Sequence, residues 1–260
     1  MKQIKNYLFA GLAMLTISSC SKKNTDVLPP ATPEIKKTIT ASTFNGNTSF
    51  QFGPDGKPKQ FIQEKAWASY RHDFIYEPGK VTVDIYDMAT NKKLENFQVT
   101  VNDKGLMIQS IYTQYDINGN PILSNTKSFS YTAKGLLETV TSPSSFSQKY
   151  FYDAEGNNTK SEFYNGGGQL VDYTEYSYSD KLDKYPAHSI RQFTWEGFFL
   201  PALSKRLVSH MKKMNAVTNA ISFEYEMNYE LDPAGYVKKG MVDDLDPAAT
   251  DWNWTCTWDK

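Results

Sequence analysis

One turn sequence recurs along most of the chain, and it constrains the fold more than any other feature. Residues 115–120 read YDINGN and residues 152–157 read YDAEGN. A type I β-turn prefers Asp, Asn or Ser at its first position and Gly at its fourth, where φ is often positive. Seven segments follow this template: Gly53–Gly56, Asn102–Gly105, Asp116–Gly119, Thr132–Gly135, Asp153–Gly156, Asn165–Gly168 and Asp232–Gly235. Glu77–Lys80 adds a type II pattern, so we expect a series of β-hairpins.

The segments between these turns alternate between apolar and polar residues. Phe223, Tyr225, Met227, Tyr229 and Leu231 alternate with polar residues, and Val81, Val83 and Ile85 repeat the pattern. Such alternation is typical of antiparallel sheet with one buried face. The turns divide the chain into about a dozen or more strands, which is more than a flat sheet carries. We therefore predict an all-β fold, a strongly curled antiparallel β-meander or barrel-like sheet.

Residues 200–214 break this alternation. Their apolar residues fall at helical spacing, and Pro201 suits a first helical turn: Leu200, Leu203, Leu207, Met211 and Met214. We predict one amphipathic helix near 200–214 that covers an opening or a dry face of the sheet. Contact with a membrane or a partner is the alternative role.

The repeated turns have a functional alternative, which is calcium binding. Asp116, Asn118 and Asn120 place oxygen atoms at alternate positions. An EF-hand loop also needs Gly at position six and Glu at position twelve, and neither YD copy supplies both. The acidic segment VDDLDPAATD at 242–251 reads as a solvated turn. We therefore expect structural turns and no metal site.

Composition and motifs disfavour several function classes. The formal net charge is −1, without a basic strip, so we expect no nucleic-acid partner. The chain contains no Walker loop, dinucleotide fingerprint or G-x-S-x-G elbow, so we assign no cofactor and no catalytic residue. His72, His188 and His210 lie far apart in the sequence, and we interpret each as a structural residue.

The N-terminus predicts export and lipid attachment. Lys2 and Lys5 precede an apolar run that ends in Ile17-Ser18-Ser19-Cys20, which fits a bacterial lipobox. We predict a signal peptide over 1–19, a flexible lipidated tether over 20–38 and an antiparallel β domain over 39–260. Ser21 after the lipidated Cys20 favours the outer membrane and leaves the periplasmic or cell-surface side undetermined. Cys256 then has no disulfide partner within the chain.

Aromatic residues near the C-terminus are the candidate ligand-binding site. Trp252, Trp254 and Trp258 alternate along DWNWTCTWDK with polar residues, and Trp195 belongs to a second aromatic group. Stacked indoles form a platform for a sugar or another flat ligand. The alternative is that they fill the core.

The phrase from Tyr150 to Asn157 resembles the tyrosine-aspartate (YD) repeats of bacterial secreted proteins. Together with the ISSC lipobox and the chain of hairpins, it makes residues from about 40 to 260 similar to a Bacteroidetes lipoprotein family of unknown function with a porin-like β-meander. The resemblance implies a fold and a compartment, and no activity. We do not expect membrane-spanning strands, because several are short for that role.

These observations predict an outer-membrane lipoprotein, attached through lipid on Cys20, that acts as a noncatalytic binding or accessory module. Its expected ligand is an envelope or extracellular glycan, peptide or protein. A structural or assembly component of the envelope without a small ligand is the alternative. A glycan hydrolase is the least favoured interpretation. It needs two carboxyl groups at a defined separation, and the sequence does not show which carboxylates lie close together.

Overall fold

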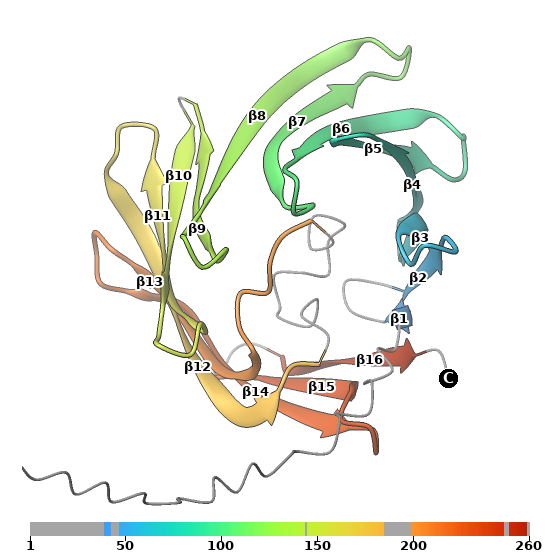
Figure 1. Ribbon diagram of the computed structural model, residues 1–260. Helices are drawn as coiled ribbons and strands as arrows, with labels where there is room; N and C mark the ends of the chain where they lie inside the picture. The colour runs from blue at the N-terminus through green and yellow to red at the C-terminus, as the bar shows by residue number, and fades with distance from the viewer. Residues whose placement is uncertain (1–38, 43–46, 144, 185–198, 247–249, 259–260) are drawn as a thin grey trace, which may run out of the picture. The chain divides into compact units, whose positions relative to one another are not determined.

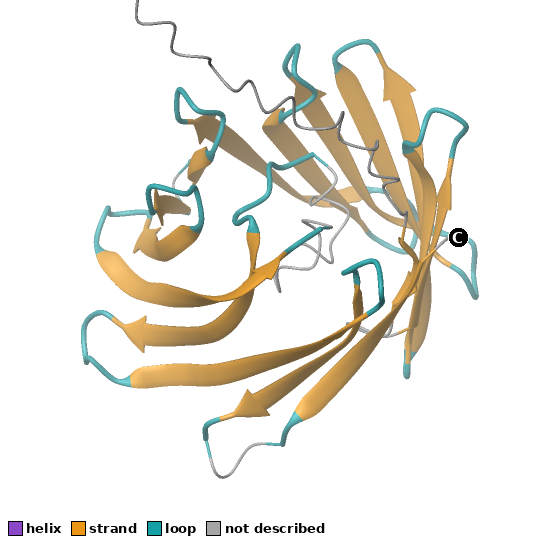
Figure 2. Ribbon diagram, turned by 60° about the horizontal axis from the view of Figure 1, so that its bottom comes forward, coloured by secondary structure: helices purple, strands orange, loops and turns teal. Residues whose placement is uncertain are grey.

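The computed structural model describes residues 39–42, 47–143, 145–184, 199–246 and 250–258. These residues form strands and loops without a helix, as Figure 2 shows. None of their elements is a helix long and apolar enough to cross a membrane. The strands are β1 (Ile39–Ser42), β2 (Asn47–Phe52), β3 (Pro58–Lys65), β4 (Ala68–Glu77), β5 (Lys80–Asp87), β6 (Lys93–Val101), β7 (Met107–Tyr115), β8 (Pro121–Tyr131), β9 (Leu137–Ser142), β10 (Phe146–Tyr152), β11 (Asn158–Asn165), β12 (Leu170–Leu182), β13 (Arg206–Asn215), β14 (Ile221–Leu231), β15 (Val237–Asp244) and β16 (Trp252–Trp258).

The strands form one antiparallel meander, in which each strand pairs with its neighbours in sequence (Figure 1). β1 pairs with β16 as well as with β2, so the hydrogen bonding runs continuously from the first strand to the last and back. The predicted alternation holds in β5, where Val81, Val83 and Ile85 are buried. The prediction of an all-β antiparallel meander is confirmed.

The repeated Gly sequences are turns, as predicted. All seven template segments place their last Gly at positive φ, between 74° for Gly56 and 92° for Gly156. The first residue fixes the loop with its side chain: Asp116 Oδ1 accepts hydrogen bonds from the backbone N–H groups of Asn118 and Asn120, each at 2.8 Å. The Asp116 carboxylate, which suggested calcium binding, therefore accepts hydrogen bonds from the backbone of its own turn.

The predicted helix near 200–214 is wrong, because Arg206–Asn215 is strand β13. The physical reason is a β-bulge. Ser177 and Tyr178 of β12 are adjacent, whereas their partners His210 and Val208 are two residues apart. The extra residue brings Val208 and Met211 into one apolar cluster although they are three positions apart. In the sequence, this spacing mimics a helical period.

The two ends of the sheet differ. Because the strands alternate in direction, the connections β2–β3, β4–β5, β6–β7, β8–β9, β10–β11, β12–β13 and β14–β15 share one end, which carries the turns with Gly56, Gly79, Gly105, Gly135, Gly156 and Gly235. We call it the glycine-turn end.

Residues 199–205, which lead into β13, cross the interior near the glycine-turn end (Figure 1). The Phe199 carbonyl accepts a 2.9 Å bond from the Met107 N–H, and the Leu203 carbonyl accepts a 2.8 Å bond from the Asn158 N–H. Phe199 and Leu203 are buried in the largest apolar cluster with Val83 and Val99. This part of the interior is therefore packed.

Candidate binding site

A row of inward-facing side chains crosses five neighbouring strands. Direct cross-strand pairing joins Phe61 of β3, His72 of β4, Ile85 of β5, Glu95 of β6 and Gln114 of β7. By strand alternation, the row shares a face with the buried Val83 and Val99. It lies toward the end opposite the glycine turns, where the turn after β3 and the turn after β7 both lie.

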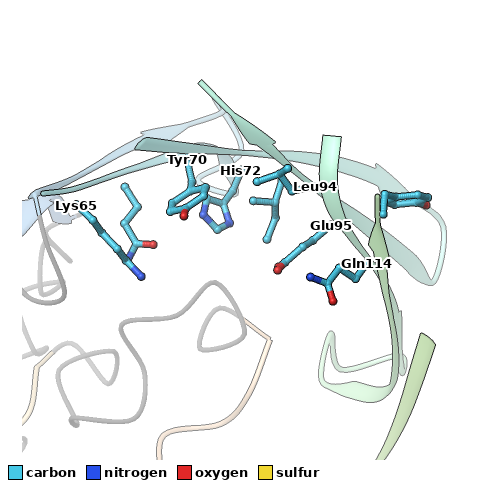
Figure 3. Close-up of a pocket in the computed structure, with 9 residues that line it drawn as sticks. Lys65, Tyr70, His72, Leu94, Glu95 and Gln114 are labelled. Carbon is cyan, nitrogen blue, oxygen red and sulfur yellow. The ribbon is translucent and has the colours of Figure 1, made fainter. Parts of the chain in front are cut away.

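A pocket of about 400 Å³ lies beside this row. His72, Glu95, Gln114, Lys65 and Tyr70 line it (Figure 3). Their side chains project from the strands to one side of the sheet, with Lys65 at one side of the pocket, Glu95 and Gln114 at the other and His72 between them (Figure 3). The volume falls within the range of about 300–1,000 Å³ for small-molecule sites.

His72 is the most constrained polar group in this pocket. It is 7% exposed, and neither ring nitrogen has a hydrogen-bond partner among the described residues. Burial lowers the pKa of the imidazole to about 4, with opposing and smaller effects of Asp73 and Lys65. The ring is therefore neutral at pH 7, with one donor nitrogen and one acceptor nitrogen. The interpretation of His72 as a structural residue stays a prediction, and the described residues supply none of the hydrogen bonds that such a residue usually has.

Two opposite charges line the same pocket, and they lie apart. The Lys65 ammonium lies 5.8 Å from the ring centroid of Trp67 and 5.9 Å from that of Tyr70. Glu95 Oε1 accepts a 3.1 Å hydrogen bond from the Tyr112 hydroxyl. Burial, with the Glu95 charge as a second cause, raises the pKa of Tyr112 to about 12, so the phenol remains a donor at neutral pH.

A second pocket, of about 280 Å³, also lies toward the end opposite the glycine turns, between β10, β11, β12, β13 and β14. Its charged residues are already paired, since Lys213 Nζ lies 2.9 Å from Asp172 Oδ2. A ligand in this pocket would therefore not be needed to neutralise either of these two charges.

The structure separates the tryptophans that the sequence singled out. Trp254 is 1% exposed and packs with Leu207, Val237 and Cys256. Trp252 and Trp258 are half-buried, and Trp258 Nε1 donates a 2.8 Å bond to the Val237 carbonyl.

Trp254 has the place in the core that the alternative interpretation gave it, and Trp252 and Trp258 pack against the same cluster. A ligand-binding role for these tryptophans stays a prediction. Trp195 and Cys20 lie outside the described residues.

Sequence reasoning missed the pocket residues. The available signal was the frame of β4, in which Tyr70 and His72 alternate in step with the buried Phe74. This alternation places the polar ring of His72 on the buried face of the sheet. Within the described ranges, no group of three or more His, Cys, Asp or Glu residues could hold a metal ion.

No family model matches the chain, and a search of the curated proteins finds no match. Solved structures do match. A porin-like protein from Bacteroides vulgatus has 15% identity and a TM-score of 0.55, and the match covers 84% of this chain and 97% of that one. A porin-like protein from Bacteroides uniformis has 12% identity and a TM-score of 0.57, over 88% and 94% of the two chains. At these identities, the likeness shows that the chain shares their fold.

Proposed function

We propose that this protein is a noncatalytic binding module that lipid on Cys20 anchors to the outer membrane. The N-terminal lipobox supports the anchor. The porin-like fold of the two Bacteroides structures agrees with an envelope location. The ligand is a small molecule, or an end of a larger one, from the envelope or the surrounding medium.

The pocket beside His72 carries this proposal. A buried polar group without a hydrogen bond costs about 1–3 kcal/mol of folding free energy. His72 bears this cost at both ring nitrogens, although an apolar side chain would avoid it. A ligand that forms hydrogen bonds with the imidazole offsets this cost, which would explain a histidine at this buried position.

Two other functions are less favoured. A structural component without a small ligand is the alternative, and the packed cluster around Val83 and Phe199 is the observation in its favour. A glycan hydrolase needs two carboxyl groups across a cleft. Glu95 is the one carboxylate among the described residues that line the His72 pocket.

The proposal is tested by tryptophan fluorescence of the full chain, purified in detergent, against a panel of glycans and short peptides. Trp67 reports on the site, because its ring contacts the Lys65 ammonium that lines the pocket. We expect a saturable change with at least one compound, lost in a His72→Leu variant that keeps the fold. Saturable binding that is unchanged in His72→Leu, or no response to any compound, contradicts the proposal.

A further inference from the structure

The charges of the His72 pocket identify the class of its ligand. In the described part of the chain, neither Lys65 nor Glu95 forms an ion pair with an opposite charge. The second pocket differs, because its Asp172 and Lys213 neutralise each other. Among the described residues, the His72 pocket therefore presents an unpaired cation and an unpaired anion at the same time.

The spacing of these groups indicates how long the ligand is. Glu95 lies two strands from His72, or about 10 Å across the sheet. Lys65 lies four residues along β3 from Phe61, the partner of His72, or about 13 Å. The long side chains of Lys65 and Glu95 shorten this separation, and Figure 3 shows them on opposite sides of His72. A single amino acid has its two charges too close together to reach both groups.

We propose that the pocket binds a short zwitterionic peptide, with its ammonium group at Glu95 and its carboxylate at Lys65. This inference rests on the proposed function and specifies its ligand. The peptide backbone between the two charges supplies N–H and C=O groups, which match the one donor and one acceptor of the neutral His72 ring. Ile85 and Leu94 provide apolar contacts for a side chain.

A neutral sugar fits this chemistry less well. Its hydroxyl groups hydrogen-bond to Glu95 and Lys65 and neutralise neither of them, whereas ionised partners form shorter and stronger hydrogen bonds.

The test is isothermal titration calorimetry of the full chain with trialanine. The comparison ligands are trialanine capped at both ends by N-acetyl and amide groups, N-acetyl-trialanine, and maltotriose. We expect trialanine to bind at least tenfold more tightly than the doubly capped peptide. A Glu95→Gln variant should bind trialanine about tenfold more weakly and leave the affinity for N-acetyl-trialanine unchanged. Glu64→Gln, an exposed change on the same strand as Lys65, is the matched control and should alter neither affinity.

Equal affinities for free and capped trialanine overturn the inference, as does an unchanged affinity in Glu95→Gln. Maltotriose binding that His72→Leu abolishes, without trialanine binding, also overturns it and leaves the proposed function standing. If the whole panel of glycans and peptides gives no signal, both fail.

Discussion

At the scale of single residues, Gly240 shows why Trp254 can occupy the core. The two residues are direct partners on β15 and β16. A Cβ atom at position 240 would lie 2.2 Å from Trp254 Cε2, closer than any non-bonded contact allows. The indole therefore lies against bare backbone, and the absent side chain is what makes room for it. The backbone at this glycine does not have a positive φ, so its requirement is steric alone.

We predict that Gly240→Ala destabilises the protein by about 1–3 kcal/mol, because the indole must move out of a packed cluster. Urea unfolding followed by tryptophan fluorescence measures the change. Gly167→Ala is the control, since its new Cβ would approach nothing closer than Asn165 Oδ1 at 3.4 Å. Equal stabilities of the two variants would show that the cluster tolerates the displacement.

The burial of His72 leads us to predict that the folded protein loses stability in mild acid. Above pH 6.5, the ring is neutral in both the folded and the unfolded chain. As the pH falls from 6.5 toward 4, the unfolded chain takes up a proton that the folded chain excludes, because burial lowers the folded pKa to about 4. We expect a loss of about 2–3 kcal/mol between pH 7 and pH 4.5.

The loss is measured by urea unfolding at both pH values, for wild type and His72→Leu. The variant should lose less stability by that amount. The same pH dependence in wild type and His72→Leu would contradict the assignment.

At the scale of elements, tyrosines near strand ends link one strand to the strand before it. The Tyr131 hydroxyl of β8 donates to the carbonyl of Met107, the first residue of β7. Tyr152 of β10 bonds in the same way to Leu137, the first residue of β9. Each acceptor follows a glycine turn, where the strand pairing shifts by one residue. In the YDAEGN segment, Tyr152 thus hydrogen-bonds to the previous strand, and Asp153 accepts a hydrogen bond from the backbone of its own turn.

We predict that Tyr131→Phe costs about 1–2 kcal/mol, because the Met107 carbonyl loses a partner in a partly buried position. Burial raises the pKa of Tyr131 to about 12, which agrees with a phenol held away from water. Chemical denaturation of the purified variant measures the effect. Tyr173→Phe is the control, since the ring of Tyr173 contacts the Lys160 ammonium and Phe preserves that ring. A cost in the control equal to that of Tyr131→Phe would exclude the bond as the cause.

The hairpins could be predicted from sequence because their causes are local. A positive φ favours Gly within a four-residue turn, and alternation follows from the pleat. The bulge in β13 was not predictable, since one extra residue changes the face of every later side chain. The His72 pocket depends on the register of five strands, which several such shifts determine together. For this reason, no single segment showed that Glu95 and Gln114 would be neighbours of His72.

At the scale of the whole molecule, the two ends of the sheet have different surfaces. Trp67, Ile117 and Val217 lie in connections at the end opposite the glycine turns, and Trp67 and Ile117 are 78% and 77% exposed. The turns at the glycine-turn end carry small, polar and charged residues such as Asp103, Lys104 and Glu155. The His72 pocket lies toward the end opposite the glycine turns, whereas residues 199–205 cross the interior near the glycine-turn end.

The proposed anchor joins the sheet at the glycine-turn end, because Ile39 of β1 pairs with Trp258 at the end of β16. In the proposed anchor, attachment depends on the acyl chains, each buried CH₂ of which contributes about 0.8 kcal/mol.

We therefore predict that Cys20→Ala transfers the protein from the membrane pellet to the soluble fraction after carbonate washing. The carbonate wash removes proteins held by charge alone, so retention by lipid and retention by contacts of the folded domain give different results. Cys256→Ala is the matched control, because Cys256 is buried in the apolar cluster with Trp254 and Val237 and is not available for lipid attachment. It should remain in the pellet. If Cys20→Ala stays in the pellet as completely as Cys256→Ala, the folded domain holds the membrane by itself and the lipid anchor is not its means of attachment.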